Sequence, residues 1–160
     1  MKNLILTILA TASLSALQAQ QSTLPQLLSE YYKIKDALVA SDSKTVSANA
    51  TDFEKLAKSI DEKTLPEKEQ KVLRGTLPAL IKDAAQIATA KNTEDQRKYF
   101  QSLSGNMFIL AESVKIVDQP IYQQYCPMKK AYWLSNEQNI KNPYYGKQML
   151  NCGKVTKTLK

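Results

Sequence analysis

The fold is decided by residues 24–38, LPQLLSEYYKIKDAL, in which apolar side chains recur at spacings of three and four. This is the periodicity of an α-helix with one buried face, because 3.6 residues make one helical turn. The stretch therefore predicts an amphipathic helix whose apolar stripe needs a partner surface. The stripe consists of Leu24, Leu27, Leu28, Tyr31, Ile34 and Leu38.

Three further stripes of the same kind follow, over residues 46–60, 72–87 and 100–114. Tyr31 and Phe53 fit the helical periods, so we interpret them as core aromatics and not as a cofactor-binding pair. Four amphipathic helices joined by short connections pack as an antiparallel bundle. The predicted fold class is mainly α, with this four-helix bundle over residues 24–118.

Local signals predict details of the last two helices. Gly75 and Pro78 lie inside the third stripe, which predicts a kink or two helical pieces. Thr93 and Gln96 match a capping box, which predicts that the fourth helix starts there. The sequence Asp118-Gln119-Pro120 is expected to end that helix.

The C-terminal segment, residues 119–160, has a different character. Short aromatic runs at 121–122 and 131–134, and the alternating pattern at 155–159, predict strands or extended segments. Asn142 and Gly146 are interpreted as turn residues. A segment this small is expected to fold only by packing against the bundle, and its large aromatic side chains are the expected anchors. These anchors are Trp133, Tyr144 and Tyr145.

The chain opens with the pattern of a secretory signal peptide. Lys2 is followed by an apolar region from Leu4 to Leu17, and Ala19 offers a small residue for cleavage. We therefore predict a signal peptide over residues 1–19 and a single exported domain over residues 20–160, in the bacterial periplasm. The apolar region is too short for a transmembrane helix, which needs about 20 residues. No membrane span is expected after the signal peptide is removed.

The composition removes several classes of enzyme. The chain has no histidine, so serine and cysteine nucleophiles that depend on a histidine base are excluded. The usual catalytic zinc sites and the two-histidine blue-copper site are excluded for the same reason. A thiol oxidoreductase normally carries Cys-x-x-Cys, which is absent. We therefore predict that the protein is not an enzyme and that it has no catalytic residues.

Positive charge is concentrated in the C-terminal segment. Residues 20–120 carry 14 Lys and Arg against 14 Asp and Glu, whereas residues 121–160 carry 7 lysines against the single acid Glu137. Nearby positive charge favours thiolate over thiol. In a periplasmic protein this charge is not expected to bind nucleic acid.

The same segment contains both cysteines of the chain and two of its four methionines. Thiolate and thioether sulfurs are the soft ligands that suit Cu(I) and Ag(I). If the chain folds back on itself, the four sulfurs could face one ion. The candidate ligands are Cys126, Met128, Met149 and Cys152.

The two cysteines have a second interpretation. In an oxidising compartment two cysteines usually pair, and a Cys126–Cys152 disulfide closing about 27 residues would stabilise the fold by roughly 3–4 kcal/mol. Met128 and Met149 would then be packing residues, and the protein would be a disulfide-stapled binding or adaptor module without metal. The spacing of the residues leaves both interpretations open.

Four runs of the C-terminal segment carry a resemblance to a known family. They are Tyr125-Cys126-Pro127-Met128, Ala131–Ser135, Ile140–Gly146 and Met149–Gly153. The helical part contributes Lys35–Val39, and Gln96-Arg97 with Phe100 and Leu103-Ser104. Together they resemble a bacterial periplasmic family of unknown function, whose members occur alone or fused to adaptor subunits of heavy-metal efflux pumps.

The resemblance implies a role in copper or silver handling. By position it carries over the two cysteines and two methionines as candidate ligands of Cu(I) or Ag(I), with no other cofactor. An efflux adaptor or another periplasmic protein is the implied partner.

Overall fold

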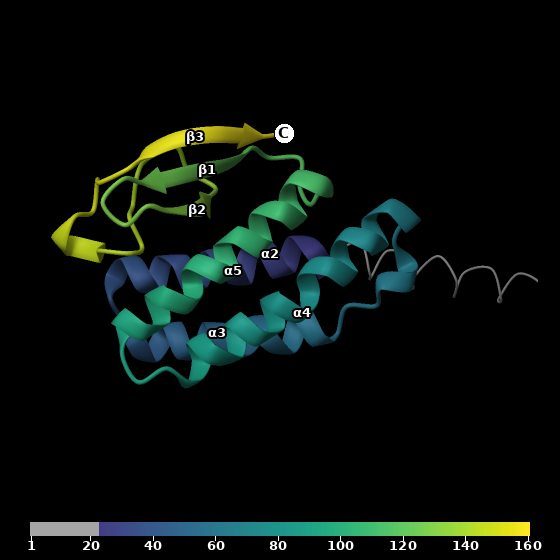
Figure 1. The fold of residues 1–160 in the computed structure, drawn as a ribbon, viewed down its shortest axis with the longest axis horizontal. Helices are drawn as coiled ribbons and strands as arrows, with labels where there is room; N and C mark the ends of the chain where they lie inside the picture. Colours follow the sequence, from purple (N-terminus) through teal and green to yellow (C-terminus); the bar gives the residue numbers. More distant parts are fainter. Residues whose placement is uncertain (1–22) are drawn as a thin grey trace, which may run out of the picture.

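The computed structural model describes residues 23–160, and the predicted signal peptide lies outside them. The chain forms four α-helices followed by a small three-stranded sheet (Figure 1), as the mainly α fold class predicted. The helices are α2 (Thr23–Ala40), α3 (Ser43–Lys58), α4 (Glu67–Thr89) and α5 (Thr93–Ser113). The strands are β1 (Ile121–Cys126), β2 (Ala131–Ser135) and β3 (Lys154–Leu159), with short 3-10 helices η1 (Glu62–Thr64) and η2 (Gly146–Gln148).

The predicted apolar stripes form one core. On α2 the whole stripe is buried, and Tyr31 and Phe53 are fully enclosed, which confirms them as core aromatics. Removing a side chain of this size from water stabilises a fold by about 1.5–3 kcal/mol. The bundle is therefore held chiefly by the stripes that the periodicity predicted. Within residues 23–160, no helix has the length and apolar character needed to cross a membrane.

The structure corrects two predicted features of α4 and α5. Helix α4 runs without interruption from Glu67 to Thr89 with Pro78 inside it, so of the two predicted alternatives, a kink or two helical pieces, the division into two pieces is wrong. Proline inside a helix costs about 3 kcal/mol; here Leu73 and Leu80 are buried on either side of it and hold the helix in the core. Helix α5 ends at Ser113, five residues before the predicted Asp118.

The start of α5 also differs from the capping-box prediction. Asn92, not Thr93, caps the helix, and its side chain accepts a hydrogen bond from the Asp95 amide at 2.9 Å. The Gln96 side chain is instead buried and donates to the Ser43 carbonyl and the Ser47 hydroxyl, both at 3.0 Å. Gln96 therefore joins α5 to the start of α3.

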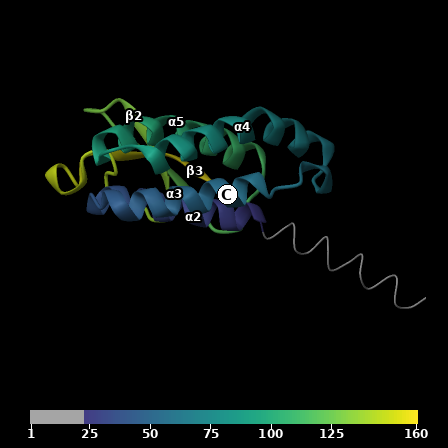
Figure 2. The same ribbon diagram turned by 90° about the horizontal axis from the view of Figure 1, so that it is seen from below.

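The strands form an antiparallel sheet in the order β2-β1-β3, with a bulge at Thr156 of β3, opposite Gln123 and Gln124 of β1. The sheet lies along α5 and α2 and covers one side of the bundle (Figures 1 and 2). The predicted strands are confirmed, although β1 extends further than the aromatic run at its start indicated. Cys126 is its last residue.

Tyr31 joins the sheet to the bundle. Its hydroxyl, fully buried, lies 2.8 Å from Ser104 Oγ on α5 and accepts the Leu134 amide of β2 at 3.0 Å. Burial raises the pKa of Tyr31 above its ordinary value, so the hydroxyl stays protonated. One α2 side chain therefore bonds to both α5 and β2.

The predicted aromatic anchors pack as expected. Trp133 and Tyr144 are buried, and Tyr145 is half-buried. The Tyr144 ring lies 5.9 Å from the Phe100 ring of α5 and 6.0 Å from Trp133. Its hydroxyl donates to the Tyr132 carbonyl at 2.5 Å. Tyr144 thus packs the C-terminal segment against α5.

Candidate functional site

Strand pairing brings the two cysteines together at one end of the sheet. Cys126 is the last residue of β1, and Cys152 precedes β3 by two residues. Tyr125 of β1 is the register partner of Lys154 of β3, so Cys126 lies near the residues that precede β3. The Cys126 and Cys152 sulfurs lie 3.7 Å apart. Cys126 is buried and Cys152 is partly exposed.

In this structure Cys126 and Cys152 do not form the disulfide of the alternative prediction. Both cysteines are free thiols, and their separation of 3.7 Å is far beyond the roughly 2.05 Å of an S–S bond. Hydrogen bonds hold each sulfur in place. The turn that follows β1 donates the Lys129 amide to Cys126 Sγ at 3.4 Å and the Met128 amide to Cys152 Sγ.

The Met128 amide favours negative charge on the Cys152 sulfur, whereas the other surroundings of Cys152 oppose it. Desolvation raises the pKa of Cys152, and the hydrogen bond to the Cys126 thiol raises it further, while the Met128 amide lowers it. The net direction is upward, so the Cys152 thiol keeps its proton at neutral pH. A cation that binds both sulfurs must displace such a proton.

Asn142 fixes the main chain of Cys152. Its fully buried side chain donates to the Cys152 carbonyl at 2.7 Å and accepts the Tyr144 amide at 2.8 Å. Its own amide donates to the Leu150 carbonyl at 2.8 Å. The sequence predicted only a turn residue here, because the distant bond to Cys152 depends on a fold-back that local spacing does not encode.

Arg97 and Gly146 attach the same segment to the bundle. Arg97 Nε donates to the Pro143 carbonyl at 2.8 Å, and Nη2 donates to the Leu38 carbonyl at 3.1 Å and to Ser41 Oγ at 3.0 Å. Gly146 has φ +55°, and a Cβ there would lie 2.7 Å from Ser41 Oγ, which confirms its predicted turn role. Arg97 appeared in the sequence only as part of a resemblance, without an assigned task.

The structure brings together two of the four predicted sulfur ligands. Met128 is 64% exposed, and Met149 is half-buried. The Met128 main chain already contacts Cys152 through its amide. Ligation by the two thioethers stays a prediction. Across the described residues, 23–160, no group of three or more His, Cys, Asp or Glu side chains gathers where it could hold a metal ion.

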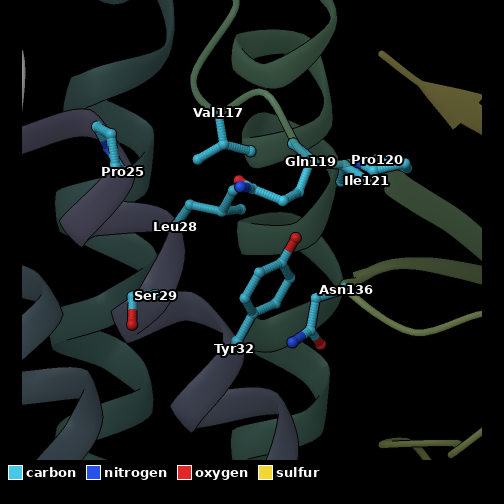
Figure 3. Close-up of a pocket in the computed structure, with 9 residues that line it drawn as sticks. All are labelled: Pro25, Leu28, Ser29, Tyr32, Val117, Gln119, Pro120, Ile121 and Asn136. Carbon is cyan, nitrogen blue, oxygen red and sulfur yellow. The ribbon is translucent and has the colours of Figure 1, made fainter.

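A cavity of about 260 Å³ lies elsewhere, between α2 and the segment that enters β1 (Figure 3). Pro25, Leu28, Tyr32 and Val117 line it together with Ile121, the first residue of β1. Ile121 and Cys126 are at opposite ends of that strand, about 17 Å apart at 3.3 Å per residue. The cavity is therefore separate from the thiol pair.

The fold and the thiol pair define a helical-bundle domain with a small dithiol-bearing sheet. Comparison with family models gives the family: the model described as "Protein of unknown function (DUF3347)" matches residues 27–119. The chain belongs to this DUF3347 family. The matched region covers α3, α4, α5 and all but the first four residues of α2, and it stops before β1 and the sulfur residues. No curated protein and no solved structure matched the chain.

Proposed function

We propose that this protein binds a soft monovalent metal ion, Cu(I) or Ag(I), between Cys126 and Cys152, and that it carries no enzymatic activity. The observation that carries the proposal is the 3.7 Å separation of two free thiols that receive amide hydrogen bonds from one turn. Thiolate ligands select Cu(I) and similar soft ions over Mg²⁺ or Ca²⁺, which prefer oxygen.

The separation of the sulfurs fits a shared ion. At a metal–sulfur distance of about 2.3 Å, two sulfurs on one ion lie at most about 4.6 Å apart, and about 3.8 Å apart at a tetrahedral angle. The observed 3.7 Å is close to the value for a tetrahedral angle. Both thiolates can therefore ligate one ion without a change in strand register.

Charge also supports the proposal. Two thiolates and one monovalent cation leave a net charge of −1, which the amides of Met128 and Lys129 and the nearby lysines can offset. We further propose that Met128 and Met149 complete the ligand set. Thioethers are neutral, so they would add soft donors without further negative charge.

The predicted signal peptide and the resemblance to proteins fused to efflux adaptors support a periplasmic role in heavy-metal efflux or homeostasis. A periplasmic binder would hold the ion or pass it to an efflux complex. The partner would be a periplasmic protein, such as an efflux adaptor.

The test is an anaerobic titration of the reduced protein with Cu(I) in competition with a chromogenic chelator. We expect wild-type protein to withdraw one Cu(I) per chain, and the double variant Cys126→Ser/Cys152→Ser to lose this competition. Circular dichroism of the variant checks that the bundle remains folded. Equal competition by both proteins, or none by the wild type, would overturn the proposal.

A further inference from the structure

The end of the sheet that carries the thiols also carries unpaired positive charge. Lys129 and Lys130 lie in the turn between β1 and β2, Lys147 lies in η2, and Lys154 begins β3. We call these four residues the lysine rim. Among residues 23–160, no acidic side chain forms a salt bridge with any of them. By contrast, Lys141 pairs with Glu137, and Lys157 pairs with Glu112.

Exposed apolar side chains accompany the lysine rim. Met128, Tyr132, Leu150 and Val155 are all more than a third exposed, and among the described residues Ile109 is the one other large apolar side chain of this kind. Tyr132 and Tyr125 form a ring pair on β2 and β1, with centroids 4.6 Å apart. Apolar and aromatic side chains surrounded by charge are typical of protein-binding surfaces.

We propose that the lysine rim and the apolar side chains beside it dock an acidic partner protein that exchanges the metal ion with Cys126 and Cys152. This inference rests on the proposed metal-binding function. Four unpaired lysines in one region favour a partner of negative charge. The partner is a protein because exchange needs soft donor atoms, which a lipid headgroup or nucleic acid backbone does not supply.

The exposure of the sulfurs sets the order of exchange. Met128 is the most exposed, Cys152 is partly exposed and Cys126 is buried. A partner sulfur would therefore displace Met128 first, then Cys152, and Cys126 last. Each step forms one metal–sulfur bond and breaks another, and the ion stays monovalent. A thiolate that leaves the ion takes up one proton from the solvent, which reverses the proton release on binding.

The experiment measures transfer of Cu(I) from two synthetic peptides that share a Met-x-x-Met core. One peptide is flanked by aspartates and the other by lysines. Transfer is followed by the fluorescence of Trp133, the only tryptophan in the sequence. Its ring is the nearest contact of a Cβ placed on Gly153, at 2.9 Å, so it lies beside the residue that follows Cys152.

We expect transfer from the acidic peptide to be about tenfold faster or more at low ionic strength, and the advantage to shrink as salt is added. The variant Lys130→Gln/Lys147→Gln/Lys154→Gln should lose this advantage. The matched control, Lys68→Gln/Lys71→Gln/Lys82→Gln, removes the same charge from exposed positions on α4 and should retain it.

The equilibrium Cu(I) affinity, measured on the same samples, separates the two proposals. Normal affinity with equal transfer from both peptides would overturn the docking surface alone, whereas absent affinity would overturn the metal-binding function. Equal losses in both lysine variants would show a general charge effect and contradict a local surface. Binding to phosphatidylglycerol vesicles that depends on the lysine rim, without any peptide preference, would identify a lipid surface instead of a protein partner.

Discussion

Substitution of Asn142 by alanine should loosen the segment that carries Cys152 while leaving both thiols in the chain. The change removes the bonds from Nδ2 to the Cys152 carbonyl and from the Tyr144 amide to Oδ1. Two hydrogen bonds at about 0.5–1.5 kcal/mol each, with the Tyr144 amide left unsatisfied, give a loss of about 2–4 kcal/mol. For a domain of this size the loss corresponds to a fall in Tm of about 6–15 °C.

The same substitution should weaken metal binding. Mutation of a residue that hydrogen-bonds to a metal ligand and fixes its orientation typically lowers the metal affinity by about 10–100-fold. We therefore expect the Cu(I) affinity of Asn142→Ala to fall by at least about tenfold. Thermal unfolding of the metal-free protein and chelator competition measure the two effects. Asn151→Ala is the control, because this neighbouring asparagine is exposed. If the two variants have the same Tm and the same affinity, the positioning role of Asn142 is refuted.

Three further predictions concern the backbone, the thiols and the thioethers. Gly146→Ala should destabilise the fold by at least about 2 kcal/mol in denaturant unfolding, because the left-handed backbone costs about 1–2 kcal/mol and the new Cβ would lie 2.9 Å from the Val39 carbonyl. The control Gly75→Ala, at a position on α4 with open space for a Cβ, should be neutral or stabilising. A larger loss of stability in Gly75→Ala than in Gly146→Ala would contradict the predicted strain at Gly146. Because the pKa of Cys152 is raised, the apparent Cu(I) affinity should increase with pH through the neutral range, by about tenfold per unit for each proton displaced; a flat pH profile would show that no thiol proton is lost. Met128→Leu should lower the Cu(I) affinity without changing the Tm, since Met128 is exposed, and an unchanged affinity would remove Met128 from the ligand set.

The four-helix bundle could be predicted from the sequence because its cause is local. Each stripe repeats with the period of a helix, and a buried face needs only the next helix along the chain. The signals at helix ends were less decisive. Asn92 and Thr93 are adjacent candidates for the same cap, and the structure uses Asn92. Pro78 destabilises the helix locally, but the burial of apolar side chains along the whole of α4 outweighs that loss of stability.

The candidate site could be predicted only in part. The soft character of Cys126 and Cys152 follows from their residue type, but their proximity depends on the pairing of β1 with β3, which local patterns do not specify. The choice between bonded sulfurs and free thiols was therefore open at the level of sequence. The roles of Asn142 and Arg97 also come from contacts between distant parts of the chain.

The most direct test of the central claim is X-ray absorption at the copper K edge of the reduced protein loaded with one equivalent of Cu(I). We predict at least two sulfur ligands on each copper, and a change in the first coordination shell in either Cys126→Ser or Cys152→Ser. A first shell of nitrogen and oxygen alone, or a sulfur shell that neither substitution alters, would contradict a metal ion shared by the two cysteines.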